Sequence, residues 1–392
     1  MNITKVILTN WKNFKSVNVS LTDRVFAVGA NAAGKSNFLD VFRFLRDIVK
    51  QAGGLQNAVQ IRGGISKIRS LAARRDPVVG IEIHLGKGSD LDDEPRWKYI
   101  LKLKSTGGGI IEKGAQIVEE NVYDGIKKKW ILRRKSDDQG EDPETLRFTH
   151  LEQPTSNQLF REIYFFLQET QYLHVVPQLI RDSDSYLLAA NKEDFYGRNL
   201  LEKMGKTTKK TRDSYLKRIN EVLKLAVPQL ENVNFILDKN GVPHLEAVYK
   251  HWRPNAGKQQ EDQFSDGTLR LIGFMWALLD GQETILLEEP ELYLNVEIVK
   301  LLPEFIYKMQ RRRGKIRQVI ISTHSYDMLN GGGIGADETL VLIPGAEGTE
   351  IKMAKDLQQI VNYLTAGATI AETVVPMVSP TTVQGMLNLK IQ

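Results

Sequence analysis

The fold is decided by the stretch Gly29-Ala30-Asn31-Ala32-Ala33-Gly34-Lys35-Ser36. It fits the P-loop pattern of glycine, four residues and then Gly-Lys-Ser. The apolar run from Val25 to Val28 precedes it and suits a buried strand, and apolar residues recur at helical spacing behind it, from Phe38 to Val49. The motif therefore lies between a strand and a helix, where a phosphate-binding loop must lie.

The residue types of this loop suit phosphate binding. Glycines allow a tight turn that aims successive backbone N–H groups at phosphate oxygens, and the positive end of the following helix adds to the attraction. We expect Lys35 to bridge the outer phosphates of ATP and the Ser36 hydroxyl to be a ligand of Mg²⁺. The nucleotide-binding residues predicted here are Asn31, Ala32, Ala33, Gly34, Lys35, Ser36 and Asn37.

Composition limits the class of protein. Of the 392 residues, 42% are hydrophobic and 26% charged, which is the balance of a globular chain with a large core. Cysteine is absent, so the sequence has no disulfide framework and no thiolate metal site. No window approaches the ~20 apolar residues that a membrane helix needs, and we expect a cytoplasmic protein without membrane contact. The net charge of +5 permits contact with a polyanion without requiring it.

The periodicity of apolar residues predicts the order of elements. Helical spacing dominates residues 153–230, and alternating segments predict strands elsewhere, those between residues 78 and 134 forming an antiparallel sheet. These strands are 3–8, 17–21, 78–85, 97–104, 130–134, 233–237 and 245–249. We expect an α/β P-loop NTPase fold with a mixed central sheet, an antiparallel β subdomain and a mainly helical insertion. The predicted division is an N-terminal head half at 1–87, an insertion at 88–262 and a C-terminal head half at 263–392.

A second half of an ATP site follows much later in the chain. The apolar strand that begins at Thr284 ends in Glu288-Glu289-Pro290-Glu291, and a further strand ends just before His324. We expect Glu288 to hold Mg²⁺, directly or through water, and Glu289 to orient and polarise the attacking water. A histidine one element beyond paired glutamates can reach a terminal phosphate. Glu289 and His324 are therefore the predicted catalytic residues, and Ser36 and Glu288 the predicted metal ligands.

A second helix start lies about twenty residues before the acidic strand. Ser265 is a good N-cap for the apolar residues that recur at helical spacing from Leu271 to Leu279, so free N–H groups and a positive dipole end are expected there.

Two parts of the site stay open at this stage. Gln56 and Gln60 are both candidates for a glutamine that contacts magnesium, and their spacing does not choose between them. Asn13 and Phe14 are candidates for stacking on adenine.

The order of these motifs resembles an ABC-type ATPase of the RecF, SMC and overcoming-lysogenization-defect branch. The opening Leu8 to Ser16 also resembles that branch, and the likeness covers about residues 1–85 and 264–345. The resemblance implies that two heads dimerise with ATP between them, and that Ser265 and Gly267 of one head contact the γ-phosphate held by the other. It implies that His324 is the switch histidine. Asp266 stands where the commonest signature has glycine, and Glu288 replaces the more usual aspartate.

Some relatives carry a metal-dependent nuclease domain behind the head. Only about 70 residues follow His324, and they contain no Asp-x-Asp pair. Asp182-Ser183-Asp184 lies upstream, and we interpret it as a helix start or turn. The tail from Lys355 to Gln392 resembles tails of small ATPases that work with a separately encoded effector, commonly a Toprim-type nuclease, in bacterial antiphage defence. The expected partners are a second copy, in a homodimer or higher homo-oligomer, and a separate effector.

Two other functions compete with this one. A RecF-like clamp would act on DNA without an effector, whereas the nucleotide-binding subunit of a membrane transporter is disfavoured by the large insertion. DNA is a candidate partner because basic clusters occur at residues 127–135, 206–212 and 311–317, although each also suits a solvated surface. The nearby aromatics, Trp130 and Tyr215, are too few to predict a base-stacking platform.

Overall fold

The computed structural model describes residues 1–87, 94–106, 114–138, 142–181, 196–250, 257–281, 283–312 and 315–379. Asp182-Ser183-Asp184 lies outside them. The helices are α1 (Lys35–Val49), α2 (Leu55–Gln60), α3 (Ile65–Ile68), α4 (Arg161–Glu169), α5 (Pro177–Arg181), α6 (Leu200–Lys206), α7 (Lys209–Ala226), α8 (Asp266–Leu279), α9 (Val296–Gln310), α10 (Tyr326–Asn330), α11 (Gln358–Thr365) and α12 (Ile370–Val378). The strands are β1 (Asn2–Trp11), β2 (Phe14–Ser20), β3 (Arg24–Val28), β4 (Val79–Gly86), β5 (Trp97–Ser105), β6 (Ala115–Asp124), β7 (Lys129–Lys135), β8 (Gln171–Leu173), β9 (Leu230–Leu237), β10 (Pro243–Tyr249), β11 (Lys258–Gln260), β12 (Ile285–Glu288), β13 (Arg311–Arg312), β14 (Lys315–Ile316), β15 (Val319–Thr323), β16 (Thr339–Gly345) and β17 (Gly348–Met353).

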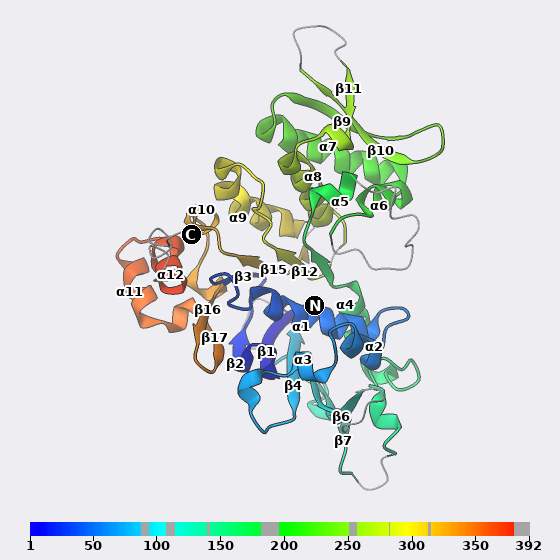
Figure 1. The fold of residues 1–392 in the computed structure, drawn as a ribbon, viewed down its shortest axis with the longest axis vertical. Helices are drawn as coiled ribbons and strands as arrows, with labels where there is room; N and C mark the ends of the chain where they lie inside the picture. Colours follow the sequence, from blue (N-terminus) through cyan, green and yellow to red (C-terminus); the bar gives the residue numbers. More distant parts are fainter. Residues whose placement is uncertain are drawn as a thin grey trace, which may run out of the picture.

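The central sheet crosses the middle of the molecule in the order β17-β16-β3-β15-β12-β8 (Figure 1). All its neighbouring strands pair in parallel except β16 and β17. Alternate residues of β3 enter two different cores, Val25 and Ala27 on the side of α1, Phe26 and Val28 on the side of α8. Because helices cover both faces, the inner strands β3, β12 and β15 are predominantly apolar. The carboxyl ends of β3, β15 and β12 meet at one edge, which is where the predicted site residues follow.

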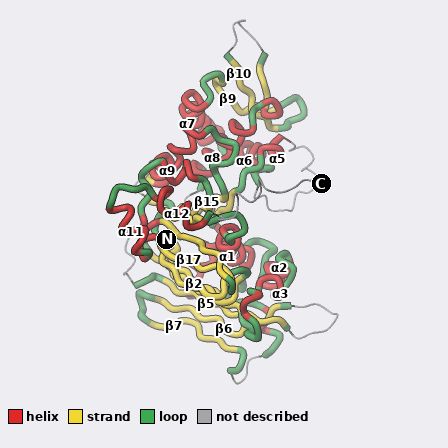
Figure 2. Tube along the Cα trace, turned by 60° about the vertical axis from the view of Figure 1, so that its left-hand side comes forward, coloured by secondary structure: helices red, strands yellow, loops and turns green. Residues whose placement is uncertain are grey.

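The second large sheet is antiparallel, in the order β2-β1-β4-β5-β6-β7. Its inner residues, such as Ile83 of β4 and Leu101 of β5, join the core that surrounds α1. Figure 2 shows its strands side by side across the lower part of the molecule, with no helix in front of them. The antiparallel subdomain predicted from the sequence is confirmed, and this sheet also contains the first two strands of the chain.

A third group of elements lies above the central sheet in Figure 1. Here α6, α7 and the three-stranded sheet β11-β10-β9 pack around α8 in the second core. The longest helix of the described chain is α7, with 18 residues. None of the helices in the described ranges is long and apolar enough to cross a membrane.

The mixed α/β architecture is as predicted, but several strands of the described chain had no prediction, namely β6, β8, β11, β13, β14, β16 and β17. Strand β6 was not predicted because Glu120, a buried and inward-facing carboxylate, interrupts its alternation of apolar and polar residues. Strand β8 has only three residues and no pattern of its own. The predicted boundary at residue 87 falls between β4 and β5, which are neighbours in one sheet, and β8 of the central sheet lies within the predicted insertion. The division of the chain into three parts stays a prediction.

Candidate active site

The loop between β3 and α1 has the backbone that a phosphate cradle needs. Ala32 and Gly34 have positive φ angles of 64° and 99°. A Cβ on Gly34 would lie 2.1 Å from the side-chain nitrogen of Asn13. That position therefore needs glycine both for its left-handed backbone and for space.

Asn13 fixes this loop from outside. Its Nδ2 donates to the carbonyl oxygen of Ala33 and contacts Thr349 Oγ1, both at 2.9 Å. Its Oδ1 accepts from Asn37 Nδ2, also at 2.9 Å. The side chain thus joins the loop to α1 and β17. Its neighbour Phe14, the other candidate for adenine stacking, is completely buried in the first core and has no open face for a base.

Lys35 is folded back onto its own loop. Its Nζ donates to the carbonyl oxygens of Gly29 at 3.0 Å and Ala30 at 3.1 Å. Burial lowers the pKa of Lys35, against the opposing effect of the carboxylates of Glu289, Glu291 and Glu288. The ammonium group is therefore poorly compensated, and phosphate oxygens are better acceptors for it than neutral carbonyls.

Ser36 and Glu288 come together across 252 residues of sequence. Ser36 Oγ donates to Glu288 Oε1 at 2.5 Å. Hydroxyl and carboxylate oxygens are the hard donors that Mg²⁺ prefers, so these two residues fit the predicted metal. When bound there, Mg²⁺ would neutralise charge on the outer phosphates of ATP.

Tyr172 of β8 and His174, just after that strand, contact Glu288, and sequence reasoning missed both. Tyr172 pairs with Leu286 of β12, and its hydroxyl donates to Glu288 Oε2. Burial, reinforced by the Glu288 carboxylate, raises the pKa of Tyr172, so the hydroxyl stays protonated and can donate. His174 Nδ1 lies 3.2 Å from the carbonyl oxygen of Glu288. Both oxygens of the predicted metal ligand are thus held in place.

The next residue, Glu289, has a left-handed backbone with φ of 44°. Its N–H donates to the carbonyl oxygen of Ser322 at 3.0 Å, and its carbonyl accepts from Arg270 Nη2 at 2.5 Å. Its Oε1 lies 2.9 Å from His324 Nδ1. Strained backbone of this kind persists only where neighbours hold it, and it often occurs at active sites. The two residues predicted as catalytic therefore contact each other.

The third glutamate after the apolar strand, Glu291, has a structural role. Glu291 is buried, and Thr323 Oγ1 donates to its Oε1 at 2.6 Å. Burial raises the pKa of Glu291. This contact fastens the loop after β12 to the end of β15.

The predicted signature begins α8 on the other face of the central sheet from α1 (Figure 1). Ser265 caps the helix by accepting from the Thr268 N–H at 3.2 Å. A Cβ on Gly267 would lie 2.7 Å from the carbonyl oxygen of Tyr293. Among the described residues, no hydrogen bond joins Ser265 or Gly267 to the P-loop of the same chain.

The unusual acid of the signature is neutralised. Asp266 forms an ion pair of 2.6 Å with Arg181 of α5 and accepts from Gln178 at 2.9 Å. The negative charge that Asp266 adds is thereby compensated by a residue outside the motif.

Neither candidate glutamine reaches the metal ligands in the part of the chain that the structure covers. Gln56 Nε2 donates to the carbonyls of Ala115 and Arg147, and its Oε1 accepts from the Ala115 N–H. Gln60 is exposed at the end of α2. The place beside Glu288 is taken by Tyr172 instead.

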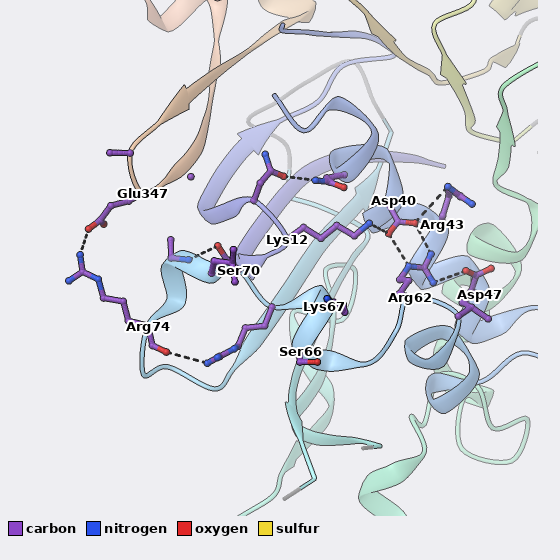
Figure 3. A pocket seen from close by; sticks show the side chains of 18 of the residues that line it. Lys12, Asp40, Arg43, Asp47, Arg62, Ser66, Lys67, Ser70, Arg74 and Glu347 are labelled. Carbon is purple, nitrogen blue, oxygen red and sulfur yellow. Dashed lines mark hydrogen bonds and ion pairs between the residues drawn. The ribbon is translucent and has the colours of Figure 1, made fainter. Parts of the chain in front are cut away.

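A cavity of about 1280 Å³ adjoins the P-loop through Asn13 and Asn37. Figure 3 shows other residues that line it, Arg62, Asp40 and Asp47 among them. On one wall, Arg62 donates to both oxygens of Asp40, at 2.8 and 2.9 Å, and to Asp47 at 2.8 Å. Burial alone would raise the pKa of Asp40, but the hydrogen bonds from Arg62 and the nearby charge outweigh it, and the pKa is lowered. The charged side chains of this wall are thus paired with each other.

Two solved structures illustrate the fold. An Smc head bound to the C-terminal winged-helix domain of ScpA shares 14% identity, covers 90% of this chain and 98% of its own, and has a TM-score of 0.52. An Smc head from Pyrococcus furiosus with an extended coiled coil, bound to the C-terminal domain of ScpA, shares 11% identity, covers 93% and 99%, and has the same TM-score of 0.52. These identities are low, so the likeness concerns the fold alone. No curated protein matches this chain.

A family model does match, over residues 28–329, from the P-loop strand to α10. The matched range contains the P-loop, the signature, the acidic strand and His324. The chain belongs to the family described as AAA domain, putative AbiEii toxin, Type IV TA system, and it is an ATPase of the AAA/ABC type.

Proposed function

We propose that this chain binds ATP with Mg²⁺ and hydrolyses it between two heads, and that head dimerisation senses phage or DNA and controls a separately encoded effector. In this proposal it is a cytoplasmic, OLD-like antiphage ATPase, and a Toprim-type nuclease is the favoured effector class. In this proposal the nuclease activity belongs to the effector. The family match supports ATP binding and turnover. We add the roles of the individual residues, the dimer, the effector and the role in defence.

One observation carries the chemistry: two polar pairs lie side by side at adjoining strand ends. Ser36 with Glu288 offers the oxygens for Mg²⁺, and Glu289 with His324 offers a base and an orienting partner for the attacking water. Lys35 lies within electrostatic reach of all the acids of this loop. The adjoining cavity is large enough for the nucleoside part of ATP.

The dimer is supported by the absence, within the described chain, of any hydrogen bond between the signature and the P-loop of the same molecule. Ser265 and Gly267 present a helix N-terminus that no hydrogen bond joins to the P-loop of the same molecule. Such an end attracts phosphate. In a head-to-head dimer it would cover the nucleotide of the other subunit, and the compensated charge of Asp266 removes an electrostatic objection.

Two findings support a second component. The family description names a toxin–antitoxin system, which by definition has more than one component. In the two similar solved structures, the Smc head is bound to a domain of another protein, ScpA. Heads of this fold can therefore carry a partner, and the resemblance of the tail from Lys355 onward adds to the case.

The first test uses Glu289→Gln, which should bind ATP without hydrolysing it. With ATP and Mg²⁺, light scattering should report a dimer, and Lys35→Ala should stay monomeric because it cannot hold the nucleotide. A Glu289→Gln protein that remains monomeric at saturating ATP would contradict the proposed assembly.

The second test identifies the partner. The ATP-locked Glu289→Gln protein is purified from its native host, and its companions are identified by mass spectrometry. A stoichiometric nuclease or other toxic effector, absent from a matched Lys35→Ala preparation, supports the effector proposal.

A RecF-like DNA clamp is the second candidate function. The exposed lysines 127–129, at the turn between β6 and β7, favour it. DNA and repair proteins alone in the preparation would favour this alternative.

A further inference from the structure

The outer face of the antiparallel sheet has an aromatic and cationic row that no motif predicted. Cross-strand pairing aligns one residue from each of β1, β4, β5, β6 and β7. This outer row consists of Lys5, His84, Lys98, Tyr123 and Trp130. At the usual strand spacing it spans ~19 Å.

The row faces away from the core. Its sequence neighbours Val6, Ile83 and Tyr99 point inward and are fully buried, whereas the members of the row are partly exposed. Three short helical segments that contact β5 and β6, namely α2, α3 and the 3₁₀ turn Thr145–Arg147, place apolar side chains in the inner core, and the 3₁₀ turn Leu71–Ala73 contacts β1 and β2. Figure 2 shows β2, β5, β6 and β7 uncovered in that view. Within the described ranges, no helix or strand covers this outer face of β4 to β7.

Aromatic rings and cations interleave along the row. The Tyr123 and Trp130 rings meet edge to face with centroids 5.3 Å apart. Lys98 Nζ lies 5.0 Å from the centroid of the Tyr123 ring. The Cζ atom of the exposed Arg133 lies 5.2 Å from the centroid of the Trp130 ring. Tyr123 and Trp130 lie on opposite sides of the turn between β6 and β7, and the pairing of these two strands is what brings their rings together.

The cations of this face outnumber its available carboxylates. Glu82 is engaged by His84 at 2.7 Å, and Glu119 by Lys102 at 2.6 Å. Glu94, at the edge, accepts from the Tyr123 hydroxyl at 2.8 Å. In the described chain, no carboxylate lies within ion-pair distance of the face's remaining cations, which are Lys5, Lys98, Lys104, Arg133 and Lys135.

We propose that this outer face binds single-stranded nucleic acid. Unpaired cations attract the phosphate backbone, and partly exposed aromatic side chains on an open sheet are the platform on which unpaired bases stack. A duplex keeps its bases stacked on each other and cannot use the rings. An acidic protein could use the charges but gains nothing specific from the aromatic row.

This inference deepens the sensing part of the proposed function. It stands apart from the ATP site, because the outer row contributes no residue to the P-loop, β12 or β15. Binding can therefore be measured without nucleotide, and its failure would leave the ATPase assignments untouched.

The experiment measures binding of a labelled oligothymidine of about 15 nucleotides by fluorescence anisotropy over a range of salt. The test variant is Lys98→Glu/Arg133→Glu, and the matched control is Lys217→Glu/Arg218→Glu on the exposed face of α7, which changes the net charge equally. We expect the test variant to bind about tenfold or more weakly and its salt slope to fall by about 1.4, while the control stays within about twofold of the unmodified chain.

Trp130 tests the aromatic part. Trp130→Ala should bind about tenfold more weakly with an unchanged salt slope, and Trp130→Phe should recover most of the affinity. Both sets of variants should keep their ATP turnover measured without nucleic acid, which shows that they fold. Equal losses for test and control pairs, a duplex that binds as tightly as the single strand, or equal competition by polyglutamate would overturn the proposal.

Discussion

The two six-stranded sheets of this molecule keep their polar side chains in different places. The inner strands of the central sheet are apolar on both faces, and the chemistry of this sheet lies at the carboxyl ends of β3, β12 and β15. The antiparallel sheet has one apolar face, and its polar side chains lie along the strands, on the outer row and at a few buried inward positions. Changes at the central strand ends should therefore alter turnover, and changes in the antiparallel lobe should alter stability or binding.

Two buried carboxylates, on β6 and in the loop that follows β7, hold the connecting segments of the antiparallel lobe, which is the antiparallel sheet with α2, α3 and residues 142–152. Glu120 is fully buried and accepts from the N–H groups of His150 and Leu151, at 2.8 and 3.2 Å. Nearby, Glu152 accepts from the Leu55 N–H at 2.7 Å, at the start of α2, and from Thr149 Oγ1 at 3.1 Å. Burial raises the pKa of both carboxyls, that of Glu152 to about 7.

The largest expected effect is on turnover at the central sheet. Glu289→Gln removes the predicted base while keeping a side chain of the same size, so the rate of ATP hydrolysis should fall about 10³-fold. The free energy of unfolding should stay within about 1 kcal/mol, because the backbone contacts of Glu289 remain. The control is Glu297→Gln, whose side chain is 78% exposed on α9. Wild-type turnover by Glu289→Gln would exclude its catalytic role.

The second prediction concerns pH and the antiparallel lobe. Because the folded-state pKa of Glu152 lies above that of the unfolded chain, the native state binds the extra proton, and this contribution to stability is complete below about pH 4.5. It is lost as the pH rises through about 7. Between about pH 5 and pH 8 the loss should be about 2 to 3 kcal/mol, measured by urea unfolding.

Glu152→Gln keeps an acceptor oxygen but cannot titrate. Its unfolding free energy should therefore fall less than that of the unmodified protein over the same pH range, and ATP turnover should be unchanged. Glu144→Gln, in the same lobe with a side chain 76% exposed, is the control. The same pH dependence in Glu152→Gln and in the unmodified protein would show that another group carries it.

The sequence is informative where function needs a contiguous motif. Ser36 and Glu288 lie in runs whose local pattern specifies strand, turn or helix, and the structure brings them to hydrogen-bond distance. The sheet is different. Strand β6 could not be predicted because the burial of Glu120 depends on backbone donors about 30 residues away. The contact between Tyr123 and Trp130 depends on a β-bulge, which the periodicity of the sequence does not show. Contacts that depend on which strands become neighbours need the tertiary structure.

Tyr172 is the sharpest case, because it lies on a strand that has no sequence signal and yet contacts Glu288. Tyr172→Phe removes only the hydroxyl that holds Glu288 Oε2. Groups that orient a metal ligand typically change metal affinity or activity 10–100-fold. We expect turnover to fall about tenfold and half-saturation to require more Mg²⁺, with ATP affinity and unfolding free energy nearly unchanged.

The control for this prediction is Tyr164→Phe on α4, a partly buried ring against the same core with no hydrogen bond to Glu288. Excess Mg²⁺ should restore part of the turnover of Tyr172→Phe and have no effect on the control, because only a misoriented metal ligand is corrected by mass action. If the two variants lose turnover equally, or if Mg²⁺ dependence does not change, β8 contributes packing alone. In that case the chemistry of the central sheet would be confined to the strand ends that the sequence predicts.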